Sequence, residues 1–235
     1  MTRQLVYSCV FVLAFVRTIA AAEPKSLFNG KDLDGWDGDT SIWSAEDGAI
    51  VGRTTADAPL KNNTFLIWRG EKLGDFRLTL QYRIQGGNSG VQYRSKVVDP
   101  AKWIVGGYQA DIDSGPEYTG ILYDERGRGI LAKRGERVTI DREGKSKAAA
   151  FADAAELMKA VRAEDWNDYV IEARGPRLRH TINGKLMSET EDNDEKNRVA
   201  SGILALQVHQ GPPMTVQFRK IKLETLDAKT PNEKP

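Results

Sequence analysis

One stretch of the chain alternates apolar and polar residues without a fault: Phe76-Arg77-Leu78-Thr79-Leu80-Gln81-Tyr82-Arg83-Ile84. Successive side chains of a β-strand point to opposite faces, so the alternation predicts a strand with one buried and one wet face. Similar short strands are expected elsewhere, at Ser41–Ser44, Ala49–Arg53, Thr64–Trp68, Gly90–Ser95, Tyr108–Ile112, Arg137–Ile140, Tyr169–Arg174, Arg177–Ile182, Lys185–Thr190, Ile203–Val208 and Thr215–Leu223. Many short strands separated by turn signals predict an all-β sandwich of two sheets.

Three local signals refine this expectation. Asn183-Gly184 between two strands is typical of a tight type I′ hairpin. The apolar positions of the last strand change parity, which a β-bulge near Arg219–Lys220 would reconcile. The segment Ser146–Ala163 is rich in Ala and has apolar residues at helical spacing, so we expect one inserted helix there, with Ser146 as a candidate cap.

The N-terminus has the layout of a secretory signal peptide. Arg3 precedes an apolar run, Leu5–Val16, and Ala20-Ala21-Ala22 then supplies small residues for cleavage. The alternative is a membrane anchor, but the run has only 12 residues and a spanning helix needs about 20. We therefore expect a signal peptide over residues 1–22, a single domain over 23–226, a polar tail over 227–235, and a secreted or periplasmic location.

Composition restricts the classes of partner. The only cysteine, Cys9, lies in the predicted signal, so the mature chain has no disulfide and must rely on its core. Removing Arg3 and Arg17 changes the formal net charge from +1 to −1 and leaves 213 of the 235 residues. Such near-neutrality gives no electrostatic reason to expect nucleic acid or membrane binding. No protein partner is predicted.

Polar residues alternate along three of the expected strands. If those strands are neighbours, their polar side chains form one cluster on a concave outer face, with Asp113 at its rim. The members are Gln92, Arg94, Gln109, Asp111, Gln207 and His209. An ordinary solvated sheet face is the competing interpretation. The mixture of Gln, Arg, Asp and His, in place of the usual Lys, Glu and Thr, favours a ligand site.

Within this cluster, His209 is the best candidate for proton transfer near neutral pH, and the turn Gly211-Pro212-Pro213 would place it at a strand end. His180 shares parity with apolar neighbours and is expected to pack in the interior. Asp111 and Asp113 are a second possibility, because paired carboxylates carry ordinary glycoside hydrolysis.

Aromatic side chains could stack on sugar rings, and Trp103 and Tyr123 are the candidates because they lie near loops. The glycines around Arg128 lack the strand–helix setting of a phosphate-binding loop. The sequence has neither metal-ligand spacing of the H-x-x-x-H kind nor a G-x-S-x-G nucleophile motif.

An ordered set of motifs spans nearly all of the predicted mature chain. They occur at residues 27–36 (LFNGKDLDGW), 87–94 (GNSGVQYR), 107–111 (GYQAD), 166–169 (WNDY), 182–185 (INGK), 202–211 (GILALQVHQG) and 216–221 (VQFRKI). In this order the chain resembles the 3-keto-disaccharide hydrolase family. The resemblance implies a concanavalin-like or laminin-G-like jelly-roll sandwich. It also implies cleavage of glycosides already oxidised at C3 of the sugar.

The implied chemistry needs one base of near-neutral pKa and donors for an enolate oxygen. A C3 ketone acidifies the C2 proton. A base removes this proton, the glycosidic oxygen leaves by elimination, and water can add afterwards. His209 is the expected base and Asp111 the residue that orients it. Amide and guanidinium groups that could hold the ketone and hydroxyls are Gln92, Arg94, Gln109 and Gln207. A divalent cation held by Asp111 and His209 is the alternative way to polarise the ketone.

Two other function classes fit the same fold: a non-catalytic carbohydrate-binding domain, and a protein-interaction domain of laminin-G type. Depth of the site distinguishes them. An enzyme is expected to enclose Asp111 and His209 in a cleft, whereas a lectin would have a shallow groove.

Overall fold

The computed structural model describes residues 23–226. The predicted signal peptide, residues 1–22, and the polar tail, residues 227–235, lie outside this range. Within it, no helix is long and apolar enough to cross a membrane.

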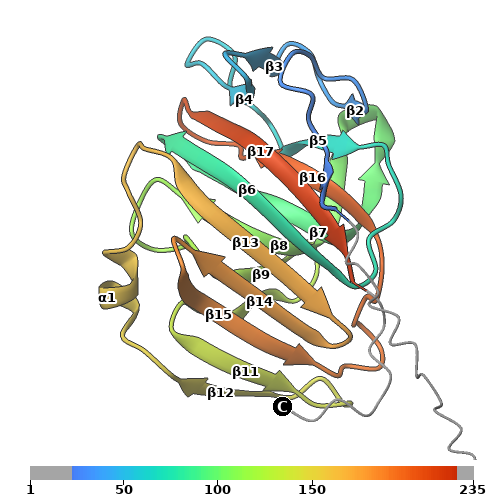
Figure 1. Ribbon diagram of the computed structural model, residues 1–235, viewed down its shortest axis with the longest axis vertical. Coiled ribbons are helices and arrows are strands. Elements are labelled where there is room, and N and C mark those ends of the chain that lie inside the picture. The colour runs from blue at the N-terminus through green and yellow to red at the C-terminus, as the bar shows by residue number, and fades with distance from the viewer. Residues whose placement is uncertain (1–22, 227–235) are drawn as a thin grey trace, which may run out of the picture.

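The chain folds into two β-sheets. The ten-stranded sheet has the order β12 (Ser146–Ala150), β11 (Glu136–Ile140), β15 (Lys185–Asp192), β14 (Arg177–Ile182), β13 (Asn167–Arg174), β6 (Phe76–Gln85), β17 (Thr215–Thr225), β4 (Ala49–Arg53) and β3 (Trp43–Glu46), with β1 (Lys25–Ser26) beside β17. The seven-stranded sheet has the order β10 (Gly129–Ala132), β9 (Leu122–Glu125), β8 (Ile104–Asp113), β7 (Asn88–Asp99), β16 (Ile203–Val208), β5 (Thr64–Trp68) and β2 (Trp36–Asp37). Figure 1 shows the larger sheet in front of the smaller one. The predicted two-sheet sandwich is confirmed.

The alternation that predicted the first strand is reproduced residue by residue in β6. Its apolar side chains are buried between the sheets and its polar side chains face outward. Leu78, Leu80 and Tyr82 are at most 2% exposed. Full burial of one such side chain contributes about 1.5–3 kcal/mol, so this face alone is a substantial part of the core.

The predicted turn and bulge are both present. Asn183 and Gly184 have positive φ angles of 47° and 77° and join β14 to β15, as a type I′ turn requires. The pairing of β17 with β6 shifts register between Arg219 and Lys222, and Lys220 has a φ of 52°. This shift restores the apolar parity of the last strand.

The predicted helix over Ser146–Ala163 is wrong at both ends. Residues Ser146–Ala150 form β12, which pairs with β11 through a turn whose amides are held by the Asp141 carboxylate. The helix α1 covers only Ala154–Met158, with Asp153 in place of Ser146 as its cap. Ala favours helix, but intrinsic propensity differs by less than about 1 kcal/mol per residue, and strand pairing along β11 outweighs it.

The β7–β8 hairpin curls over the outer face of the smaller sheet. Two register shifts bend it, between Tyr93 and Lys96 and between Val97 and Asp99. Its tip, the 3₁₀ turn η1 (Pro100–Lys102), is fixed to β5, where the Phe65 amide donates to the Trp103 carbonyl at 3.1 Å. The outer face is therefore partly covered, and polar side chains on it are buried.

Candidate active site

The three strands that carry the predicted polar cluster are neighbours, in the order β8-β7-β16. Three glutamines leave this face and are buried beneath its surface: Gln92, Gln109 and Gln207. Gln92 Nε2 donates to Gln109 Oε1 at 2.8 Å, and Gln109 Nε2 lies 3.4 Å from Gln207 Oε1. A Cβ on Gly90 would lie 2.5 Å from the Gln109 side chain, so only glycine leaves room for this amide row.

Asp111 is the buried carboxyl group of the cluster, with 4% of its surface exposed. Oδ1 accepts from Asn88 Nδ2 at 2.9 Å and from the Ile112 amide at 3.1 Å, and Oδ2 lies 3.4 Å from Gln109 Nε2. Burial outweighs these donors and raises the pKa of Asp111 to about 7, with a smaller contribution from the charge of Asp113. The group can therefore exchange a proton near neutral pH.

Asp111 lies in the wall of a cavity of about 560 Å³, called here the Asp111 cavity. The walls come from β7, β8, β9, β10 and the loops before β5 and after β16. The lining residues are Asn63, Asn88, Gln109, Asp111, Asp113, Tyr118, Ile121, Tyr123, Glu125, Ile130, His209 and Gln210. Of the predicted site residues, the cavity brings together Asp111, His209, Gln109 and Tyr123.

His209 directly follows β16, as the turn after it predicted. Its amide donates to the Asn88 carbonyl at 3.3 Å, and its Nδ1 contacts the Gln210 carbonyl oxygen. Among the hydrogen bonds of the described residues, none joins His209 to Asp111. Strand β7 separates their strands, which places the two backbones roughly 10 Å apart and leaves space between the side chains.

Glu125 is a wall residue that the sequence analysis missed. Asn63 Nδ2 donates to its Oε1 at 3.3 Å, and burial raises the pKa of Glu125, opposed by this hydrogen bond and by the charge of Arg126. Strand β9 was not predicted because Asp124, which faces inward, interrupts its polar pattern. The Arg128 guanidinium compensates this inward carboxylate at 2.9 Å. The shared parity of Tyr123 and Glu125 was the available signal.

Arg94 is not on the predicted face. It occupies the bulge of β7, with a φ of 46°, and its side chain is 1% exposed. The guanidinium donates to the Gly74 and Gly175 carbonyls and to Asp75 Oδ1 at 2.8–2.9 Å. The bulge inverts the parity on which the prediction rested, so Arg94 joins loops and does not reach the Asp111 cavity.

Trp103 also lies away from the cavity wall. Its ring packs on a small apolar cluster that includes Phe65 and Val105, and its Nε1 donates to Asp37 Oδ1 at 3.0 Å. The αL backbone of Trp103, with φ 47°, turns it over the sheet. Gln92 and Gln207 are likewise outside the wall of the Asp111 cavity, and both contact the Gln109 side chain.

His180 packs in the core, as expected. Its Nε2 lies 3.0 Å from the Tyr93 hydroxyl and its Nδ1 lies 3.1 Å from the Ile121 carbonyl oxygen. Because the carbonyl can only accept, Nδ1 carries the proton and Nε2 accepts from Tyr93. Burial lowers the pKa of His180 to about 4, so the ring is neutral at physiological pH.

The sequence also offered a divalent cation bound by Asp111 and His209 as an alternative, and the described residues supply no third ligand for such a site. Over residues 23–226, no group of three or more His, Cys, Asp or Glu side chains has the arrangement of a metal site. Asp111 and His209 remain the residues that the alternative would use.

Solved structures share the fold at low sequence identity. A "putative glycosyl hydrolase" from Parabacteroides distasonis aligns with a TM-score of 0.58 and 20% identity, covering 87% of this chain and 100% of its own. A Bacillus subtilis protein with a galectin-like fold gives 0.56 and 12%, over 88% and 96%. The carbohydrate binding module CBM66 from Bacillus subtilis gives 0.54 and 16%, over 83% and 97%. These likenesses confirm the jelly-roll architecture.

Among curated proteins, none matches the chain. A family model does: the one described as 3-keto-alpha-glucoside-1,2-lyase-like domain matches residues 23–224, almost the whole described range. The family that the sequence motifs resembled is thus confirmed. The chain belongs to the 3-keto-alpha-glucoside-1,2-lyase-like domain family.

Proposed function

We propose that this protein is an exported enzyme that cleaves 3-keto-glycosides or 3-keto-disaccharides by elimination, with water adding afterwards. The observation that carries the proposal is the Asp111 cavity. It encloses a buried carboxyl group whose pKa is raised to about 7, and His209 and Glu125 line the same space. Its volume of about 560 Å³ lies within the range of small-molecule sites.

Asp111 is the general base of the proposed reaction. The carboxylate takes the C2 proton, whose electron pair forms the enolate with the C3 ketone. The enolate then re-forms the ketone, a C1=C2 double bond forms, and the C1–O bond breaks with the leaving oxygen taking the pair. A base with a pKa near the working pH is favoured for such a transfer. This reverses the roles expected from sequence, because Asp111 has the required pKa without a hydrogen bond to His209.

Other residues of the cavity wall supply the acid and hold the base in position. Glu125, whose pKa is raised by burial, and His209 can each protonate the departing glycosidic oxygen. The Asn88 and Gln109 amides already donate to Asp111 and would hold it in position. Gln207 Nε2 is buried and has no hydrogen-bond partner among the described residues, but Gln207 lies outside the cavity wall and is given no direct part in the reaction.

The direct test is incubation with 3-keto-trehalose in deuterated water, followed by mass spectrometry and NMR of the products. Elimination followed by hydration places solvent deuterium at C2 of the released 3-keto sugar. Release of a 3-keto sugar without deuterium at C2 would mean that water displaces the leaving group directly, and would contradict the proposed chemistry.

A non-catalytic carbohydrate-binding domain is the second candidate, because CBM66 shares the architecture. A binding module has no need of a buried carboxyl group near its titration point, so the burial and raised pKa of Asp111 favour the enzyme. The same incubation separates the two: binding of an unmodified glucoside without turnover of any 3-keto-glycoside would support the binding module.

Replacing His209 by Ala is expected to lower kcat on a 3-keto-glycoside by about 10²-fold, at the lower end of the range for a proton-transfer residue. The residue is half-buried at a strand end, so the thermal midpoint should stay within a few degrees of the parent. Steady-state kinetics and a melting curve check both statements. Activity within a few-fold of the parent would remove His209 from the mechanism.

The free energy of unfolding should depend on pH in a way that reveals the raised pKa of Asp111. Its folded pKa, about 7, exceeds the ordinary Asp value of 3.8, so the native state holds the proton more tightly and stability falls as pH rises from 3.8 through 7. Between pH 5 and pH 8 the loss should be on the order of 3 kcal/mol.

Urea unfolding of the parent and of Asp111→Asn at pH 5 and pH 8 isolates the contribution of Asp111 to the free energy of unfolding. The contribution of His180 has the opposite sign, because its depressed pKa makes stability fall as pH drops from 6.5 toward 4, but it is common to both proteins and cancels. Identical pH dependence in the two proteins would show that Asp111 titrates normally.

Export is the remaining part of the proposal, and it rests on the sequence layout of Arg3, Leu5–Val16 and Ala20–Ala22. N-terminal sequencing of the protein recovered from the periplasm or medium should read from Glu23. Recovery of a chain that keeps Met1 in the membrane fraction would instead indicate an anchor.

A further inference from the structure

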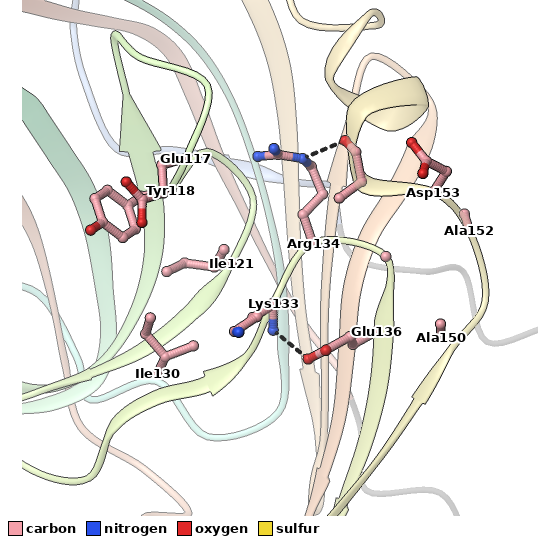
Figure 2. Close-up of a pocket in the computed structure, with 12 residues that line it drawn as sticks. Glu117, Tyr118, Ile121, Ile130, Lys133, Arg134, Glu136, Ala150, Ala152 and Asp153 are labelled. Atoms are coloured by element: carbon pink, nitrogen blue, oxygen red, sulfur yellow. Dashed lines mark hydrogen bonds between the residues drawn. The ribbon is translucent and has the colours of Figure 1, made fainter.

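A second cavity, of about 650 Å³, opens beside the Asp111 cavity and is called here the Arg134 cavity. The two share three wall residues: Tyr118, Ile121 and Ile130. Figure 2 shows these three along one side, with Ala150 and Ala152 across from them. The two cavities therefore adjoin at an apolar junction, with the buried carboxyl group on one side and the segment between β12 and α1 on the other.

The junction is unusually apolar for an exposed surface. Ile130 and Tyr118 are 44% and 38% exposed, and they are two of the four large hydrophobic side chains that are exposed among the described residues. The other two, Val98 and Val199, line a different cavity. Exposed apolar side chains gathered at a concave site indicate an apolar ligand.

Arg134 fixes the segments that form the walls of the Arg134 cavity. Its side chain is largely buried and donates to three carbonyls, those of Pro116, Thr119 and Ala154, at 2.6–2.9 Å. Figure 2 shows one of these bonds as a dashed line from the Arg134 side chain. Because these donors are used to join the loop before β9 to the start of α1, the guanidinium shapes the walls and is not free to bind a charged ligand.

We propose that the Arg134 cavity binds the leaving group of the substrate, and that this leaving group is an apolar, ring-bearing alcohol. The inference rests on the proposed function: with the sugar ring at Asp111, the group on its glycosidic oxygen must occupy adjoining space. The cavity on the other side, of about 880 Å³, shares only the charged residue Glu125 with the Asp111 cavity, and Lys96 and Arg126 line it. The wall of the Arg134 cavity also has charged residues, but the three residues that it shares with the Asp111 cavity are apolar. Besides Arg134, the charged residues are Glu117, Lys133, Glu136 and Asp153. Three apolar wall residues make the Arg134 side the route for an apolar group.

The test compares two α-glucosides oxidised at C3, one with a methyl and one with a cyclohexyl leaving group. Both are alkyl alcohols of similar leaving ability, so a difference reports binding. The parent should have a kcat/KM about tenfold higher for the cyclohexyl substrate, since a hydrophobic pocket gains about tenfold or more per well-placed group. Ile130→Ser should lower kcat/KM for the cyclohexyl substrate about ten times more than for the methyl one, mainly through KM.

Ile130→Leu should restore the cyclohexyl preference, and Val199→Ser, an equally exposed apolar position at the other cavity, should leave both reactions unchanged. Equal losses on both substrates in Ile130→Ser would overturn the inference while leaving the proposed function intact.

Calorimetric titration with the unoxidised cyclohexyl and methyl glucosides separates the two hypotheses further. If no 3-keto-glycoside is cleaved, the proposed function fails. Tighter binding of the cyclohexyl glucoside that Ile130→Ser abolishes would still support the apolar subsite, and equal binding of both glucosides would reject it.

Discussion

Asp111→Asn is expected to lower kcat on a 3-keto-glycoside by about 10²–10⁴-fold, the range for loss of a general base. An amide cannot take the C2 proton, whereas it keeps the size of the carboxyl group and its oxygen can still accept from Asn88 and the Ile112 amide. KM should change little if Asp111 acts mainly in the transition state. Steady-state kinetics with 3-keto-trehalose measure both quantities.

The matched control is Asp168→Asn, the same change at an exposed position of β13, where the carboxylate only accepts from Gln81 at the outer surface. It should keep parental activity. The pH profile gives an independent readout, because kcat/KM of the parent should rise with pH through about 7 as Asp111 loses its proton. A parental rate in Asp111→Asn, or a profile flat through neutrality, would exclude Asp111 as the base.

The second large effect is expected on stability. Arg128→Met should lower the free energy of unfolding by about 3–5 kcal/mol, because it leaves buried carboxylates without their cation. Arg128 donates to Asp192 at 2.7 Å, to Asp194 at 3.2 Å and to Asp124 at 2.9 Å. Asp192 has no exposed surface, and only the Tyr108 hydroxyl and the Asp194 amide would remain to bond its side chain.

Arg142→Met is the control, because it removes the same kind of side chain from an ion pair that is exposed to solvent. Its partner is Glu195, and both side chains are at least 70% exposed, so the change should cost less than about 1 kcal/mol. Urea unfolding of the two variants and the parent gives the comparison. If Arg128→Met has no larger effect than Arg142→Met, the buried network does not stabilise the fold. If Arg128→Met does not fold at all, Arg128→Lys retains one charge and should fall between the two.

The position of Glu125 shows where sequence reasoning about the site stopped. Its strand has four residues, and an inward Asp124 disguises the alternation that marked β6. Only the contact between Asp124 and Arg128 makes an inward carboxylate tolerable, and this contact depends on a hairpin closing with the correct geometry. A polar residue on the buried face therefore concealed both the strand and its functional neighbour.

The sequence by itself determined the two-sheet architecture, the hairpin at Asn183-Gly184 and the shared face of Gln109 and Asp111, because side-chain parity and turn chemistry are local properties of the chain. The tertiary structure alone decided that Arg94 leaves that face, since a bulge depends on the partner strand. It also decided that Asp111 is buried enough for its pKa to reach about 7, and that Ile130 borders two cavities. Burial and cavity shape arise from segments far apart in the chain, and no local pattern encodes how closely those segments meet.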